Sequence, residues 1–158
     1  MQRITILALK AVLAFAFLVC LFGEVLVIPL FANEVVGEFP EVGYLRLPGI
    51  VGSIAIVMCV QAALVGIWVL LSMVAKDAIF RPSAFRVVDV LIGCGIAQAV
   101  LFIAAFIVLS VAGATTPGAM ILIIVGTAAS GGVALLLQVM KGLLRKAVEL
   151  QSEMAEVI

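Results

Sequence analysis

Residues 90–113 read VLIGCGIAQAVLFIAAFIVLSVAG, an apolar stretch without a single charged side chain. A helix needs about 20 predominantly apolar residues to cross the hydrocarbon core of a bilayer, so this stretch is long enough to span a membrane. Lipid offers the backbone no hydrogen-bond partners, which favours a helix here. Three further apolar stretches lie around it, at residues 11–32, 47–75 and 119–140. The sequence therefore predicts an all-α integral membrane protein, a four-helix transmembrane bundle.

The composition of the whole chain supports this fold class. Of the 158 residues, 66% are hydrophobic and 11% are charged, whereas a soluble domain is about half apolar and about a quarter charged. Both a soluble globular domain and a disordered chain are therefore excluded. The nine Lys and Arg residues balance nine Asp and Glu residues, so the net charge is zero. A neutral chain gives no reason to expect direct nucleic-acid binding.

We predict one membrane domain over residues 1–158, with transmembrane helices at about 9–32, 47–74, 85–112 and 118–141. The first apolar run follows Arg3 and Lys10, as the core of a signal peptide would. It is longer than the 7–15 residues of such a core, so we expect a retained anchor helix. Residues 142–158 are expected to extend the fourth helix as an amphipathic tail, with Gly142 marking a bend.

Basic residues are distributed unevenly between the two sides of the predicted bundle. Eight of them fall on the side of the chain termini: Arg3, Lys10, Lys76, Arg81, Arg86, Lys141, Arg145 and Lys146. The opposite side has only Arg46, beside three glutamates. Cytoplasmic loops carry the excess of Lys and Arg, so we expect both termini to be cytoplasmic.

Two charged segments carry a resemblance to a known family. The link reads KDAIFRPSAFR at residues 76–86 followed by VVDV, and the tail reads GLLRKAVELQSE at residues 142–153. Together with four helices in this length, the chain resembles the DUF2975 family of bacterial membrane proteins, in an actinobacterial style. The resemblance implies a place in the bacterial cytoplasmic membrane, no established activity and no recognised catalytic residues. It also implies a cytoplasmic helix-turn-helix regulator as a partner, because members are often encoded beside one.

Three polar side chains lie deep in the predicted helices, namely Glu24, Gln61 and Gln98. An acid inside the membrane is costly and is by default a functional candidate. We expect these three residues to form an intramembrane polar cluster. It would either stabilise the bundle through interhelical hydrogen bonds, with Glu24 protonated, or form a polar cavity for a solute or a proton.

The residues around Glu24 on the first helix also favour a site there. It shares one helical face with Lys10, Phe17 and Cys20, at spacings of three, four and seven residues. Pro29 follows five residues later and removes a backbone hydrogen bond, which predicts a kink beside the acid.

Several side chains are expected to mediate helix packing. Arg86 and Asp89 are three residues apart and are expected to form an interface pair at the membrane surface. Small residues let two helices approach closely, and they recur at four-residue spacing in the third and fourth helices. The faces concerned are Asp89, Gly93 and Ala97, then Gly126 with Ser130, Thr127 with Gly131, and Ala128 with Gly132. They predict either packing within the bundle or a homo-oligomer interface.

The two charged segments suggest contacts outside the bundle. In the link, aromatic residues alternate with arginines, which is typical of contact with membrane lipids. In the tail, charged residues occupy one side of the expected helix, and an apolar docking face recurs at spacings of four, three, four and three: Leu143, Ala147, Leu150, Met154 and Val157. This face either lies on the membrane or binds the link, another copy of the chain or a soluble protein.

The sequence contains no histidine, the commonest general base and metal ligand. Cys20, Cys59 and Cys94 fall in different apolar runs and form no metal motif. We therefore expect no cofactor, no metal and no catalytic residue. The first hypothesis is a non-enzymatic interaction, sensing or regulatory protein that acts through its cytoplasmic link and tail. The alternative is a solute or proton pathway around Glu24, built in an oligomer.

Overall fold

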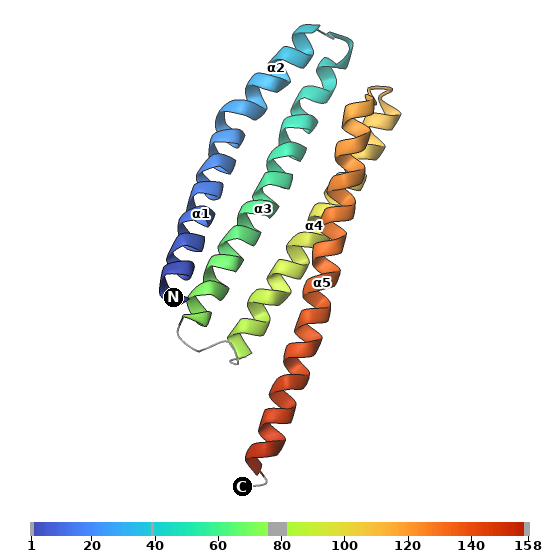
Figure 1. Cartoon of the computed structure of the whole chain (residues 1–158). Helices are drawn as coiled ribbons and strands as arrows, with labels where there is room; N and C mark the ends of the chain where they lie inside the picture. The colour runs from blue at the N-terminus through green and yellow to red at the C-terminus, as the bar shows by residue number, and fades with distance from the viewer. Residues whose placement is uncertain (1, 39, 76–81, 157–158) are drawn as a thin grey trace.

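The computed structural model describes residues 2–38, 40–75 and 82–156. Within them, four helices are long and apolar enough to cross a membrane, over Ile4–Glu34, Gly43–Val74, Ala84–Val111 and Pro117–Leu150. The spans alternate in direction, and both chain termini lie at the same end of the molecule (Figure 1). We call this the terminal end and the opposite one the distal end. The predicted all-α transmembrane fold is confirmed.

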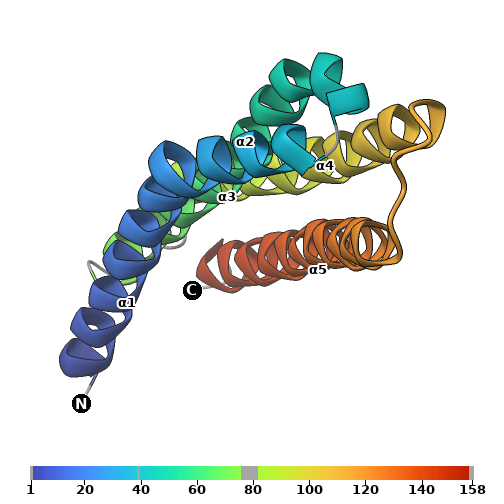
Figure 2. The same cartoon turned by 90° about the horizontal axis from the view of Figure 1, so that it is seen from above.

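The first span is one bent helix in three segments, α1 (Gln2–Phe22), the π-helix η1 (Gly23–Val27) and α2 (Ile28–Glu38). Within η1 the hydrogen bond reaches one residue further than in an α-helix, and the N–H of Ile28 donates to the carbonyl of Gly23. Pro29 has no N–H to continue the α-helical pattern, and π-turns and prolines are common causes of helix bends. Figure 2 shows the change of direction between α1 and α2.

The second and third spans are continuous helices. The 3-10 helix η2 (Pro40–Leu45) leads at the distal end into α3 (Arg46–Val74), which returns to the terminal end. After the link, α4 (Pro82–Val111) runs back to the distal end. These bounds lie close to the ones predicted from the apolar runs.

A tight turn joins α4 to α5 (Pro117–Glu156). Gly113 has a φ of 66°, the left-handed conformation that ends many helices, and the N–H of Ala114 donates to the carbonyl of Leu109 at 3.1 Å. Thr116 then caps α5, because its hydroxyl accepts the N–H of Ala119 at 3.3 Å. Pro117 occupies the first helical position, where its missing N–H costs nothing.

The fourth span and the tail form one helix, since α5 runs uninterrupted for 40 residues. The α-helix continues unbroken through Gly142, where the sequence predicted a bend. A glycine inside a helix costs about 1 kcal/mol relative to alanine. Good helix formers such as Leu143, Leu144 and Lys141 flank it on both sides, so the helix continues through the glycine.

The helices pack in chain order, with α1 and α2 against α3, α3 against α4, and α4 against α5. Few side chains are buried, because most large apolar residues face outward, where lipid surrounds a membrane protein. The buried side chains come mainly from α4 and α5 and from one residue of α1: Ala84, Leu91, Ile92, Ser130, Ala134 and Leu13.

Close approach of α4 and α5 depends on glycines. A Cβ atom at Gly95 would lie 3.2 Å from the carbonyl oxygen of Ser130 and 3.1 Å from the Cβ of Ala134. A Cβ at Gly126 would lie 2.5 Å from the ring of Phe102. The Ser130 hydroxyl donates to the Gly126 carbonyl in its own helix at 2.6 Å, so this buried polar group needs no partner on α4.

Only part of the predicted small-residue packing lies at these contacts. Gly126 and Ser130 pack within the bundle, against α4, which is one of the two predicted alternatives, whereas Gly93 and Ala97 are exposed. A Cβ atom added at Gly93, Gly131 or Gly132 would meet no described atom of another helix within 4 Å. The physical reason is that two long helices that cross touch along one stripe, and several stripes of α4 and α5 carry small residues.

Candidate functional site

The helical face that carries Lys10 and Glu24 is turned toward α3. Lys10, near the terminal end, places its ammonium 5.6 Å from the centre of the Trp68 ring, within the range of a cation–π contact. About four turns further on, Glu24 accepts a hydrogen bond from the amide of Gln61, with 3.0 Å between Glu24 Oε2 and Gln61 Nε2. Two of the three residues of the predicted polar cluster therefore meet between the first two spans.

Glu24 lies inside η1, and one of its oxygens has no partner. Its Oε1 atom is buried and makes no hydrogen bond to any described atom. A π-turn inside an α-helix is often found at a functional site. The Glu24 carboxyl group therefore has one bonded and one unbonded oxygen, and it lies on a π-helical turn. Such a group can donate or accept a proton, or bind a polar atom, if access is provided.

The third member of the predicted cluster, Gln98, is not bonded to the other two. Gln98 is half-buried on α4 and, within the described part of the chain, has no hydrogen bond to Glu24 or Gln61. The interhelical polar contact therefore joins two residues rather than three. The sequence predicted a cluster of three residues because all three are polar and lie inside apolar helices. Such a pattern does not show which face of α4 the Gln98 amide occupies.

The predicted interface pair is replaced by a different one. Asp89 forms a salt bridge with Lys141 of α5, and Arg86 is exposed. The physical reason is that α4 and α5 are antiparallel and closely packed, which brings the end of the fourth apolar run level with Asp89. This contact joins the two helices at the terminal end, and sequence reasoning missed it because the partners are 52 residues apart.

The C-terminal end of α5 extends beyond the other helices at the terminal end of the molecule (Figure 1). Leu143 and Leu150 are 63% and 60% exposed, and Ala147 is also exposed. On another side, Leu144 and Val148 are half-buried. The backbone of Met154 belongs to α5, and Val157 lies outside the described residues. The predicted docking face is therefore solvent-facing over the three of its residues whose side chains the structure describes.

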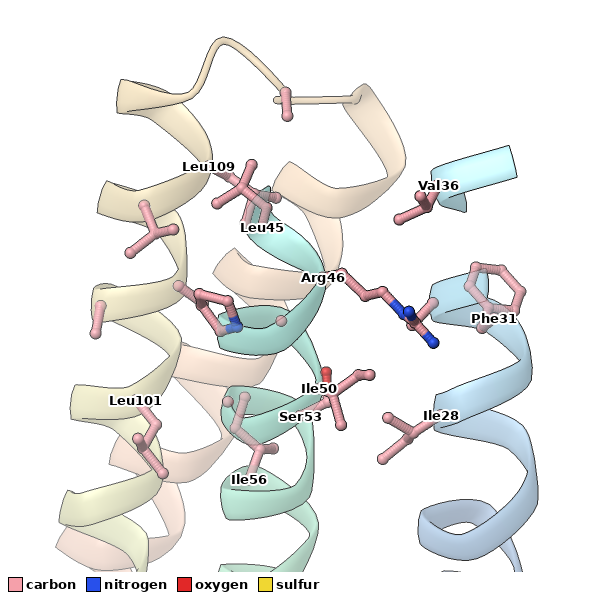
Figure 3. A pocket seen from close by; sticks show the side chains of 18 of the residues that line it. Ile28, Phe31, Val36, Leu45, Arg46, Ile50, Ser53, Ile56, Leu101 and Leu109 are labelled. Atoms are coloured by element: carbon pink, nitrogen blue, oxygen red, sulfur yellow. The ribbon is translucent and has the colours of Figure 1, made fainter. Parts of the chain in front are cut away.

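A groove that sequence reasoning missed lies at the distal end, between α2, α3 and α4. It has a volume of about 600 Å³, and its lining is almost entirely apolar. Figure 3 shows Ile28 and Phe31 on α2, Ile50 on α3 and Leu101 on α4 around it. The small residues that leave this space are a signal in the sequence: Gly49, Gly52 and Ser53 on α3, with Ala104 and Ala105 on α4.

A positively charged side chain, Arg46, lies at the distal end of this groove. The Arg46 side chain extends from α3 toward α2 (Figure 3), and its Nη2 donates to Asn33 Oδ1 at 2.5 Å. Among the described side chains, Arg46 forms no ion pair with a carboxylate. Ser53 is the other polar residue in the lining.

These features define a class, that of small multi-pass helical membrane proteins. The described residues contain no group of three His, Cys, Asp or Glu side chains that could hold a metal ion. The chain belongs to the DUF2975 family, described as proteins of unknown function, whose family model matches residues 30–158. This match confirms the resemblance carried by the link and the tail. It begins in α2, so Glu24 lies outside the matched part.

Comparison with curated proteins and with solved structures finds no match.

Proposed function

We propose that this chain is a non-enzymatic interaction module of the bacterial cytoplasmic membrane, in which the protruding part of α5 binds a soluble protein. The observation that carries the proposal is the length and exposure of α5. Forty residues give about 60 Å of helix, roughly twice the thickness of the hydrocarbon core. The excess carries Leu143 and Leu150, both more than half exposed.

The proposed orientation places this extension in the cytoplasm. Among the described basic residues, only Arg46 begins a helix at the distal end, whereas Arg3, Arg86, Lys141, Arg145 and Lys146 belong to helix segments near the terminal end. Lys76 and Arg81 lie outside the described residues and belong in the sequence to the link between α3 and α4. This distribution supports cytoplasmic termini under the positive-inside rule. Lys141, Arg145 and Lys146 precede the tail glutamates, so positive charge comes first where α5 leaves the anionic inner surface.

The partner we propose is a helix-turn-helix regulator, on the strength of the family resemblance. The apolar residues of the tail recur at alternating spacings of four and three, which suits packing against one helix of another protein. Binding would hold the regulator at the membrane and away from DNA. The lack of histidine, together with three cysteines on separate helices, supports a role without catalysis.

The test is site-specific photo-crosslinking in cells of the source organism, with a photoreactive residue in place of Ala147. We expect an adduct with a helix-turn-helix protein, identified by mass spectrometry. The variant Leu143→Glu/Leu150→Glu should lose it, because buried carboxylates oppose an apolar interface. The control Arg145→Gln/Lys146→Gln changes the net charge by the same two units, keeps the apolar face and should retain the adduct. An adduct unchanged in the leucine variant, or one made only of two copies of this chain, would contradict the proposal.

A second function is favoured by one observation, the buried Glu24 Oε1 atom without a partner. In this alternative, Glu24 relays a proton or binds a polar solute inside an oligomer. Proteoliposomes with an enclosed pH-sensitive dye distinguish the two functions. Proton flux that Glu24→Gln abolishes and Leu143→Glu/Leu150→Glu leaves intact would support the pathway. Equal dye response in protein-containing and empty liposomes would exclude a proton pathway.

A further inference from the structure

We propose that the distal groove holds one acyl chain of a membrane phospholipid, with the lipid phosphate bound to Arg46. This site lies at the opposite end of the molecule from the protruding α5 and is independent of the function proposed above. Its occupant is identified by the depth of the groove, by its lining and by the Arg46 side chain at its mouth.

The depth of the groove matches one leaflet of a bilayer. On α3 the lining runs from Arg46 to Ile56. Ten residues of helix correspond to about 15 Å, which is half of the roughly 30 Å hydrocarbon core. Ile56 lies near the middle of the span Gly43–Val74. The groove therefore extends from the membrane surface at the distal end to about the midplane, as an acyl chain does.

The lining favours a flexible apolar occupant. Its floor and walls are aliphatic and aromatic side chains, with Ser53 as the polar exception below Arg46. Water would find few hydrogen-bond partners in such a space. Cβ atoms added at Gly49 and Gly52 would meet no described atom within 4 Å, so the space beside these glycines is open. The volume of about 600 Å³ falls within the range of ligand-binding pockets.

The Arg46 guanidinium at the mouth of the groove is suited to a phosphate. Arg46 donates one hydrogen bond to the neutral amide of Asn33 and, among the described side chains, has no carboxylate partner. A guanidinium carries five N–H donors in a planar fork that fits two phosphate oxygens at once. A phosphodiester at the membrane surface would meet the remaining donors while its acyl chain enters the groove.

The experiment measures lipid binding to the full-length protein, delipidated in mild detergent, by native mass spectrometry. Dioleoyl phosphatidylglycerol is the probe, and dioleoylglycerol and glycerol 3-phosphate supply the apolar and the phosphate part separately. We expect one phosphatidylglycerol per chain and negligible binding of either part alone. Arg46→Gln should weaken binding about tenfold, as expected for loss of a charge-assisted hydrogen bond. Gly52→Phe should abolish it by filling the groove.

Two matched variants serve as controls. Arg86→Gln removes an exposed arginine at the terminal end, and Gly93→Phe adds the same ring at an open glycine outside the groove. Both should bind lipid as the wild type does, and circular dichroism should show equal helix content in all variants. Unchanged binding in Arg46→Gln and Gly52→Phe would overturn the proposal. So would binding of glycerol 3-phosphate alone, or a dimer that Gly52→Phe dissociates, since a second copy would then occupy the groove.

Discussion

At the scale of single residues, polar atoms inside the membrane are the most informative part of this chain. Glu24, Gln61 and Gln98 were predicted to form one cluster because each is a polar residue inside an apolar helix, and the structure joins Glu24 and Gln61 by one hydrogen bond. Gln98, among the described residues, forms no hydrogen bond with either of them. Asp89 shows the same limit: Arg86 is its neighbour in sequence, but Lys141 becomes its neighbour only when α4 and α5 pack. The spacing of residues along one helix identifies polar side chains that need a partner, but it does not show which residue of another helix will be that partner.

The hydrogen bond between Glu24 and Gln61 leads to a first prediction. The carbonyl oxygen of a glutamine can accept the same bond, so Glu24→Gln should unfold at the wild-type temperature in detergent. Glu24→Leu leaves the Gln61 amide unpaired and should cost about 0.6–1.7 kcal/mol, the range found for hydrogen bonds between membrane helices. A thermal unfolding series measures both, with Gln98→Leu as a control that should change little. A clear loss of stability in Glu24→Gln would show that a charged carboxylate is required.

At the scale of elements, helix lengths and ends follow from local chemistry, and helix faces do not. The apolar runs, Gly113, Thr116 and Pro117 determine where α4 ends and α5 begins, and each of these signals is visible in the sequence. The π-turn was indicated only indirectly, through the proline that follows it. Small residues recur on several faces of α4 and α5, so their pattern could not show that Gly95 rather than Gly93 faces α5.

The contrast between these two glycines gives a second prediction. Gly95→Val would force methyl groups toward the Ser130 carbonyl and Ala134, where even a Cβ is tight. Overpacking of this kind costs about 1–3 kcal/mol. Gly93→Val places the same side chain two residues away in open space, so it should leave packing intact. Thermal unfolding of the two variants measures the difference, and equal stability would show that α4 and α5 do not pack through Gly95.

At the scale of the whole molecule, the distribution of charge and apolar residues gave the architecture. Four apolar runs predicted four spans, and the even number placed both termini at one end, as the structure has them. The extension of the fourth helix was predicted, whereas the distal groove and the unbroken course of α5 through Gly142 could not be predicted in this way. The groove exists because small residues of α3 and α4, more than 50 residues apart in sequence, leave a shared space beside the bent α2. The continuity of α5 depends on helix propagation through Gly142.

Orientation is the claim on which the proposed function depends most, because a partner in the cytoplasm can reach α5 only if the termini are there. Labelling of single cysteines by a membrane-impermeant thiol reagent, added to intact cells, measures it most directly. The variants carry one new cysteine each, at Glu41 or Thr115 of the distal end or at Arg145 of the tail, with the three native cysteines replaced by alanine. We expect Glu41→Cys and Thr115→Cys to react in intact cells, and Arg145→Cys to react only after the cells are broken. Labelling of Arg145→Cys in intact cells, with protection of the two distal sites, would contradict the account.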